Sequence, residues 1–329
     1  MKNGLLLINL GTPDHPDTSA VRRYLREFLA DRRVINLPAP LRYLLLYGFI
    51  LPFRPKKSAH AYQAIWTQHG SPLLYNSQNL CHKLQDKIGN NYKVALGMRY
   101  GNPSIQEAMN QLRTCEHITI LPLYPQYSSA ATGSSIEKVL PLLENKTIFP
   151  SVTIIRDFYQ HPGFIGAQAE QIKPYINDAE YILFSYHGLP ENHLHQVGCK
   201  PVCANECPLP ARNGCYRAQC FETTNLIADA LKLPKTQYAT VFQSRLGKTE
   251  WIKPYTDTML SELAAKGIKR LAITCPSFVA DCLETLEEIG IRAKEQWLQL
   301  GGEQFTLIPS MNDDANWVEA IVRIVHDIS

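Results

Sequence analysis

Three groups of side chains in this sequence have the types and spacing for proton or metal chemistry. The first is His187, which ends the apolar run Tyr181-Ile-Leu-Phe-Ser-Tyr-His187 and is followed by Gly-Leu-Pro190. An imidazole that is neutral near pH 7 can accept a proton or bind a metal ion. A loop histidine that only hydrogen-bonds its neighbours also explains this stretch.

The second group is acidic and consists of Asp281, Glu284 and Glu288. If a helix spans about residues 279–289, these carboxylates line one of its faces at spacings of three and four. In a cleft they could take up protons or hold a divalent cation. On an exposed face they would be ordinary solvated charge.

A third group contains thiols. Five of the nine cysteines fall within residues 199–220, namely Cys199, Cys203, Cys207, Cys215 and Cys220. Such grouping favours a metal centre in a reducing compartment. The spacing lacks two clean Cys-x-x-Cys pairs, so zinc binding and free thiols both remain open.

The elements that must position these groups follow an alternating pattern. Apolar runs separated by helix-patterned segments predict parallel strands joined by crossover helices. The runs are 4–10, 93–98, 117–123, 152–157, 181–185, 238–243, 270–274 and 304–308. This predicts two similar Rossmann-like domains, 1–155 and 156–329, with the closing helix 316–328 packing on either one. Because Gly188 and Pro190 disfavour a strand, we expect His187 to lie in the turn at the carboxyl end of its strand, where open α/β sheets bind ligands.

Several other motifs keep two interpretations. Thr132, Ser134 and Ser135 could bind an anion at a helix N-terminus or simply cap that helix. Arg99 could meet the same anion or pair with a carboxylate. Trp251 suits a flat apolar ligand or an ordinary core. The turn 9–13 lacks Gly-x-Gly-x-x-Gly, so no dinucleotide fingerprint is present.

The amino-acid composition limits the kind of partner that the protein can bind. The chain has 329 residues, 45% of them hydrophobic, with 33 Lys plus Arg against 30 Asp plus Glu, a net charge of +3. This balance does not indicate a nucleic-acid surface, so we expect a small ligand. The N-terminus carries no signal-peptide cleavage pattern, which predicts a cytoplasmic protein.

One segment has a membrane-like composition. Residues 41–53 are mostly apolar but too short to span a bilayer and are interrupted by Arg42 and Pro52. Arg54, Lys56 and Lys57 follow, so the segment could be an amphipathic lip resting on the inner face of the membrane. A buried helix of an ordinary core fits the same periodicity.

Taken together, the motifs resemble those of the ferrochelatases, which insert ferrous iron into a porphyrin to make haem. The resemblance covers nearly the whole chain and rests on motif order and spacing: 7–13, 70–72, 97–100, 124–128, 132–135, 184–190, 243–244 and 278–288. It implies two Rossmann-like, chelatase-type domains with the porphyrin cleft between them. The lip would be about residues 37–60.

The resemblance also implies roles for individual residues. His187 matches the active-site histidine, and Glu284 the acidic residue that faces it across the porphyrin, with Glu288 and Asp281 continuing behind Glu284. The porphyrin propionates would be held by Arg54, Lys57, Ser71 and Ser244, with Tyr62 and Tyr100 nearby, while Leu10, Trp251 and Phe278 would be pocket walls.

The implied reaction is insertion of Fe²⁺, as substrate, into protoporphyrin IX. A free-base porphyrin must lose two pyrrole protons, so the site needs proton acceptors, an iron donor and walls that bend the ring. His187 and Glu284 would serve as acceptors and as ligands of the substrate iron. Coproporphyrin or cobalt would be alternative substrates, and a non-catalytic haem or metal carrier is the rival from another class.

Two departures from the family pattern stand out. Cys282 takes the place of a second histidine that some members carry. Residues 197–220 form an insertion, and some ferrochelatases carry a [2Fe–2S] cluster on internal cysteines. Cys199, Cys203, Cys207 and Cys215 would be the cluster ligands here, with zinc as the alternative and Cys220 as a bystander. The oligomeric state is not predicted.

Overall fold

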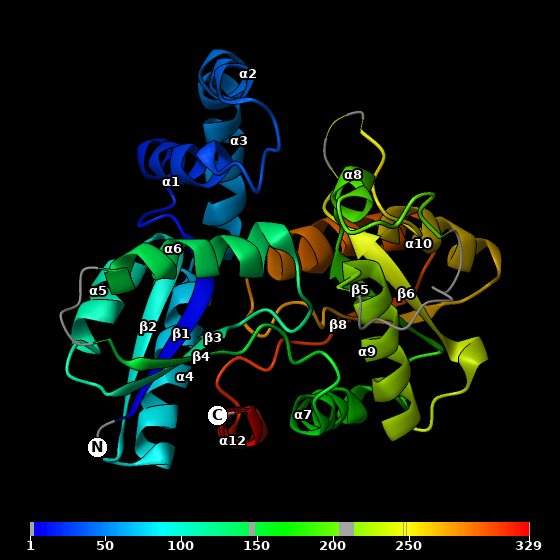
Figure 1. Ribbon diagram of the computed structural model, residues 1–329. Helices are drawn as coiled ribbons and strands as arrows, with labels where there is room; N and C mark the ends of the chain where they lie inside the picture. Colours follow the sequence, from blue (N-terminus) through cyan, green and yellow to red (C-terminus); the bar gives the residue numbers. More distant parts are fainter. Residues whose placement is uncertain (1–2, 145–148, 204–213, 246, 248, 329) are drawn as a thin grey trace. The chain divides into compact units, whose positions relative to one another are not determined.

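The computed structural model describes residues 3–144, 149–203, 214–245, 247 and 249–328. It divides into two compact units: residues 1–124, 128–157 and 322–329 form unit 1, and residues 125–127 and 158–321 form unit 2. Each unit contains one four-stranded parallel sheet flanked by helices (Figure 1). Among the described residues, we find no helix of sufficient length and apolarity to cross a membrane.

The sheet of unit 1 has the strand order β2-β1-β3-β4. Its elements, in chain order, are β1 (Asn3–Thr12), α1 (Thr18–Ala30), α2 (Ala39–Leu45), η1 (Leu46–Ile50), α3 (Leu51–Ile65), α4 (Pro72–Ile88), β2 (Tyr92–Gly101), α5 (Ile105–Gln111), β3 (His117–Pro122), η2 (Ser129–Gly133), α6 (Ser134–Glu144) and β4 (Ser151–Ile154).

Side-chain alternation along β1 assigns the helices of unit 1 to the two faces of its sheet. Leu6 and Ile8 are fully buried in a core completed by α5 and α6. Asn9 points the other way, and its Nδ2 donates to Ser77 Oγ of α4 at 3.1 Å. The apolar run of β1 is therefore covered on both faces, as expected for a parallel strand.

The sheet of unit 2 has the order β6-β5-β7-β8. Its elements are α7 (Pro162–Ile172), η3 (Lys173–Tyr175), β5 (Tyr181–His187), α8 (Glu191–His195), α9 (Tyr216–Ala230), η5 (Lys235–Gln237), β6 (Tyr238–Gln243), α10 (Thr256–Ala265), β7 (Arg270–Thr274), η6 (Glu284–Ala293), α11 (Lys294–Gln299), β8 (Gln304–Leu307) and α12 (Ala315–Ile328), whose last residues belong to unit 1.

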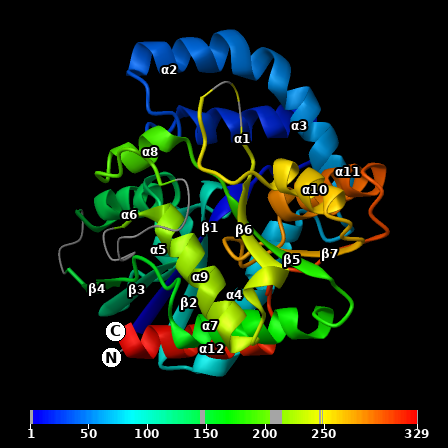
Figure 2. The ribbon, with the colours of Figure 1, turned by 90° about the vertical axis from the view of Figure 1, so that its right-hand side faces the viewer.

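The same alternation orients β5. Leu183 is fully buried in a core with α10, η6 and α11, whereas the Tyr186 hydroxyl meets Thr224 of α9 at 2.9 Å. Helices α9 and α10 lie on opposite sides of β5 and β6 (Figure 2). Odd-numbered residues of β5, His187 among them, therefore point to the face that carries α10 and η6.

Two expectations from the sequence are corrected. His187 is the last residue of β5 and pairs with Gln243 of β6, so it does not lie in a turn. The acidic helix predicted for 279–289 is a π-helix, η6, that begins only at Glu284. The sequence did not predict the π-helix, because an i, i+4 pattern of carboxylates does not distinguish an α-helix from a π-helix.

Candidate active site

A backbone carbonyl at the end of β5 determines which ring nitrogen of His187 carries a proton. Its Nδ1 lies 2.6 Å from the carbonyl oxygen of Gly188. Because a carbonyl oxygen only accepts, Nδ1 must carry the proton, and Nε2 is left as the basic nitrogen of the neutral ring. Half-buried His187 thus presents a proton acceptor or metal ligand at the carboxyl end of the strand.

Two hydrogen bonds hold this strand end in place, and the residue after it must be glycine. The His187 amide donates to Ser277 Oγ at 3.1 Å, and Tyr216 donates its hydroxyl to the His187 carbonyl at 2.8 Å. Burial keeps the pKa of Tyr216 well above its ordinary value, so this phenol stays a donor. A Cβ at Gly188 would lie 2.7 Å from the Gln243 carbonyl oxygen, so only glycine fits beside His187.

Two aromatic rings, both expected from the resemblance to be pocket walls, flank the imidazole. The ring centroid of Trp251 lies 6.5 Å from that of His187, and the ring of Phe278 lies 6.2 Å away. Trp251 is nearly buried, and Phe278 also packs on the core beneath η6. The structure therefore brings both rings to His187.

The acidic helix η6 supplies the carboxylates of the same unit. Glu284 and Glu288 are both half-buried, and η6 packs on the sheet face to which His187 points. In a π-helix, hydrogen bonds run from residue i to i+5, and such segments occur frequently at functional sites. The arrangement puts an imidazole and two carboxylates on one face of one sheet.

Glu288 is anchored by the loop that follows β6. Its Oε1 accepts the Ser244 amide at 2.8 Å, and its Oε2 accepts the Ser244 hydroxyl at 2.5 Å. Gln243 Nε2 lies 3.5 Å from the same Oε2 and 2.8 Å from the Glu284 carbonyl oxygen. Ser244, predicted to hold a propionate, is thus placed on a carboxylate of the protein itself.

Asp281 lies outside η6 and has a different environment. It is buried; its Oδ1 accepts from Thr285 Oγ1 at 3.0 Å and from the Ser310 amide at 3.2 Å. Its Oδ2 accepts from Asn312 Nδ2 at 2.8 Å, and Asn312 Oδ1 accepts the Asp281 amide at 2.8 Å. These reciprocal hydrogen bonds between Asp281 and Asn312 connect the segment before η6 to the loop after β8.

Two buried thiols lie beside the carboxylates. Burial raises the pKa of Cys282 well above its ordinary value, and the neighbouring Glu284 raises it further. Burial does the same for Cys275, with Asp281 and Glu288 adding to the effect. Both side chains therefore favour the neutral thiol over the thiolate.

In unit 1, the residues predicted to bind the porphyrin are distributed over several elements. Arg54 and Lys57 lie on α3, where Lys57 is exposed and Arg54 half-buried. Ser71 is buried at the start of α4, and Leu10 is half-buried in β1. Tyr62 is buried, with its ring edge-on to Tyr24 at 6.4 Å and to Trp66 at 6.3 Å.

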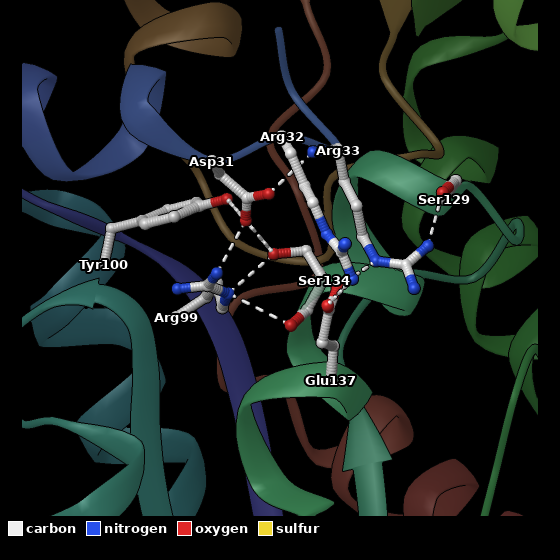
Figure 3. A network of polar contacts seen from close by, with 8 residues as sticks. All are labelled: Asp31, Arg32, Arg33, Arg99, Tyr100, Ser129, Ser134 and Glu137. Atoms are coloured by element: carbon white, nitrogen blue, oxygen red, sulfur yellow. Dashed lines mark hydrogen bonds and ion pairs between the residues drawn. The ribbon is translucent and has the colours of Figure 1, made fainter. Parts of the chain in front are cut away.

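Tyr100 belongs to a buried polar network centred on Asp31 (Figure 3). Asp31 Oδ2 accepts from Arg99 at 2.6 Å, from the Tyr100 hydroxyl at 2.9 Å and from Ser134 Oγ at 2.5 Å. Of the two interpretations of Arg99, pairing with a carboxylate is the one observed. Ser134 belongs to this network, and Ser128 caps the helical turn before it by accepting the Ala131 amide.

A second ion-pair set continues from Asp31. Arg32 and Arg33 both contact the carboxylate of Glu137 on α6, and Arg33 also donates to Ser129 Oγ at 2.8 Å (Figure 3). These contacts join the end of α1 to η2 and α6. No local pattern in the sequence indicates these contacts, because the partners are about a hundred residues apart.

The cysteine-rich insertion is only partly within the described residues. Cys207 lies outside them, and Cys199, Cys203 and Cys215 do not come together as a metal site. Throughout the described ranges, no three His, Cys, Asp or Glu side chains are grouped as metal ligands. The described part of the insertion therefore supplies no assembled cluster or zinc site.

Comparison with known proteins decides the family. A family model described as Ferrochelatase matches residues 2–328. The chain belongs to the ferrochelatase family. A ferrochelatase from Legionella pneumophila is 62% identical over 329 residues, which is 99% of each chain, and one from Coxiella burnetii is 51% identical over 332 residues, or 98% of this chain and 93% of the relative.

Solved structures with the same fold have little sequence in common with this ferrochelatase-family chain. SirB from Bacillus subtilis with Fe3+ superposes with a TM-score of 0.58 at 11% identity, covering 100% of this chain and 96% of SirB. The sirohydrochlorin chelatase SirB from the subspecies spizizenii, in complex with cobalt, gives 0.57 at 9% identity, with 100% and 95% coverage. The fold is the two-domain chelatase fold.

Proposed function

We propose that this chain inserts Fe²⁺ into protoporphyrin IX and yields protohaem, acting as a lyase of haem biosynthesis. The observation that carries the proposal is the locked tautomer of His187, whose Nε2 is basic and shares a sheet face with Glu284 and Glu288. Membership of the ferrochelatase family, at 62% identity to a full-length relative, supports the same activity.

The chemistry assigned to each residue follows from its environment. Insertion of Fe²⁺ releases two pyrrole protons, so the site must accept two protons for each turnover. His187 Nε2 accepts one proton on one face of the macrocycle. Glu284, with Glu288 behind it, accepts the second proton. Trp251 and Phe278 lie against the imidazole and restrict where the flat substrate can lie.

We propose that unit 1 recognises the substrate periphery. Arg54 and Lys57 on α3 supply the cationic groups that suit propionates, with Ser71, Tyr62, Tyr100 and Leu10 as further contacts. Units 1 and 2 would be the two Rossmann-like domains expected from the sequence, divided near residue 155.

The assay that tests the activity uses Fe²⁺ and protoporphyrin IX under anaerobic conditions. We expect His187→Ala to lower kcat by about 10² or more, as for loss of a general base, while porphyrin affinity from fluorescence quenching stays within about twofold. The matched control is His326→Ala, on the exposed side of α12, which should leave both unchanged.

Two other results would redirect the assignment. If wild-type protein binds porphyrin stoichiometrically without inserting metal, the chain is a carrier and not an enzyme. If coproporphyrin or Co²⁺ has the higher kcat/KM in competition, the substrate is corrected while the roles of His187 and Glu284 stand.

We also propose that the enzyme is cytoplasmic and contacts the inner face of the membrane through α2, η1 and the start of α3. Large apolar side chains are exposed there, including Leu44 at 62%, Phe49 at 63% and Phe53 at 76%, close to Arg54, Lys56 and Lys57. Apolar groups beside cations suit an anionic lipid surface.

A [2Fe–2S] cluster on Cys199, Cys203, Cys207 and Cys215 stays a prediction of the sequence, with zinc as its alternative. No step of the proposed reaction depends on it. The grouping of the cysteines in the sequence supports this prediction. The described residues do not form the site.

A further inference from the structure

The backbone groups of His187 lie beyond the end of the neighbouring strand β7. Pairing between β5 and β7 stops at Phe184, whereas pairing between β5 and β6 continues to His187. The Gly188 amide donates to the Gln243 carbonyl oxygen at 2.8 Å, so the backbone groups of His187, one residue earlier, face the side on which β7 has ended. An N–H and a C=O at such a position need partners from outside the sheet.

Two side chains take the place of the missing strand. Ser277, in the loop after β7, accepts the His187 amide on its Oγ at 3.1 Å. Tyr216, the first residue of α9, donates its hydroxyl to the His187 carbonyl oxygen at 2.8 Å. The donor and the acceptor of this residue are therefore both satisfied by side chains.

These two side chains also form a hydrogen bond with each other. The Tyr216 hydroxyl has one proton, which it donates to the His187 carbonyl, so the Ser277 hydroxyl must be the donor between them. The three contacts form a closed cycle that runs from the His187 amide through Ser277 and Tyr216 to the His187 carbonyl. Hydrogen bonds in a network strengthen one another, so loss of either hydroxyl should weaken the whole cycle.

This cycle restrains the peptide group on which the direction of the imidazole depends. Tyr216 holds the carbonyl of the peptide between residues 187 and 188, and Gln243 holds its amide. The next carbonyl, that of Gly188, lies 2.6 Å from His187 Nδ1 and accepts its proton. Rotation of the peptide would displace this acceptor, and the direction of Nε2 would change with it.

We propose that Tyr216, supported by Ser277, is a positioning residue that directs His187 Nε2 toward the substrate. The inference deepens the proposed function and rests on it for the role of His187 as a proton acceptor. Tyr216 is buried, and burial raises the pKa of its phenol well above the ordinary value, so the hydroxyl keeps its proton. Its effect on the reaction is exerted through His187.

The other end of β5 offers a matched control for Tyr216→Phe, which removes only a hydroxyl. Tyr181 donates its hydroxyl to the Tyr238 carbonyl oxygen at 2.9 Å, so Tyr181→Phe deletes the same kind of bond at the start of the strand. We expect Tyr216→Phe to lower kcat by about tenfold or more while porphyrin affinity stays within about twofold, because misalignment affects the reaction more than binding. Tyr181→Phe should leave both values unchanged.

A second variant tests whether the two hydroxyls act together. Ser277 is half-buried, and Ser277→Ala should lower kcat in the same way as Tyr216→Phe. The double variant should lose little more than the more severe single variant, because residues of one hydrogen-bond network are coupled. Losses that multiply would mean that the residues act separately, which contradicts the cycle.

A measurement independent of turnover follows the imidazole itself. In protein with isotope-labelled histidine, the nitrogen chemical shifts of the ring report which nitrogen carries the proton, and His187→Ala identifies the signals. At alkaline pH we expect the wild-type ring to carry its proton on Nδ1 and Tyr216→Phe to give a mixture of both tautomers. Tyr181→Phe should match wild type.

The outcomes separate this inference from the proposed function. Unchanged kcat or an unchanged tautomer in Tyr216→Phe overturns the positioning role. An equal loss of kcat in Tyr181→Phe also overturns it, because the effect would then reflect a general weakening of the strand. If wild-type protein inserts no metal, the proposed function fails, whereas the tautomer measurement still decides whether Tyr216 orients His187.

Discussion

A single carboxyl group, that of Asp31, joins three segments of unit 1. It follows α1 and accepts hydrogen bonds from Arg99 and Tyr100 of β2 and from Ser134 of α6. Burial alone would raise the pKa of Asp31. The hydrogen bonds from Ser134, the Arg33 amide and Tyr100, together with the charge of Arg99, outweigh burial and lower the pKa below its ordinary 3.8.

The Asp31 network should stabilise unit 1 in a pH-dependent way. A depressed pKa in the folded state contributes stability above the unfolded pKa of about 4, and this contribution is lost as pH falls through the lower folded value. We expect Asp31→Asn to cost about 3 kcal/mol at pH 7, because it leaves the Arg99 charge unpaired in a nearly buried site. Urea unfolding of both proteins at pH 7, 5, 4 and 3 measures the difference.

The change of this stability difference with pH tests whether the charge of Asp31 contributes to stability. The gap between wild type and Asp31→Asn should be full at pH 7 and shrink below pH 4 as Asp31 takes up a proton. Asp178→Asn, which changes an exposed aspartate, is the matched control. A gap that is constant down to pH 3 would mean that the Asp31 charge does not contribute.

At the residue scale, the local sequence left each candidate group with an ordinary interpretation as well as a chemical one. The roles of His187 and Glu284 came from the resemblance to ferrochelatases, and they stay predictions. The contact of Ser244 with Glu288 could not be predicted, because only the fold brings residue 288 to residue 244.

Among the elements, the continuous helical run α2, η1 and α3 has the most distinctive surface. We expect wild-type protein to co-sediment with vesicles containing anionic lipid and Leu44→Glu to lose most of this binding, since the substitution puts a negative charge at an exposed apolar position. Leu298→Glu makes the same change at an exposed leucine of α11 and should bind like wild type. Equal sedimentation of all three would remove the membrane proposal.

The strands were predictable and the acidic helix was not, for a physical reason. All eight apolar runs are strands, and 238–243 and 270–274 have the predicted bounds. A buried parallel strand needs only an apolar run, which the sequence displays directly. The π geometry of η6 depends on tertiary contacts such as Gln243 Nε2 on the Glu284 carbonyl, which the local sequence does not contain.

For the molecule as a whole, metal content is the most informative measurement still to be made. We expect anaerobically purified protein to contain two iron and two acid-labile sulfide per chain, with sulfide-to-iron charge-transfer bands in the visible spectrum. Cys203→Ser should lose them, and Cys81→Ser, a change outside the insertion, should keep them. Zinc in place of iron would convert the prediction to a zinc site, and metal-free protein would remove it.

The fold class was predictable from the sequence because the alternation of strand and helix extends over the whole chain. Two four-stranded parallel sheets are observed, each with helices packed against it. The motifs that carried the resemblance to ferrochelatases lie mainly at strand ends and in the loops that follow, which is where open α/β folds place their sites.

The alternation of side chains along β5 restricts how this chain can vary in evolution. Leu183, Ser185 and His187 point to one face of the sheet and Tyr186 to the other. Loss or gain of one residue within the strand would turn the imidazole toward α9, so single-residue length changes there abolish the site even where every side chain is conservative. An insertion after Pro190 does not change which residues of β5 point to which face. A segment as long as 197–220 can therefore follow soon after His187 without changing the direction of the imidazole.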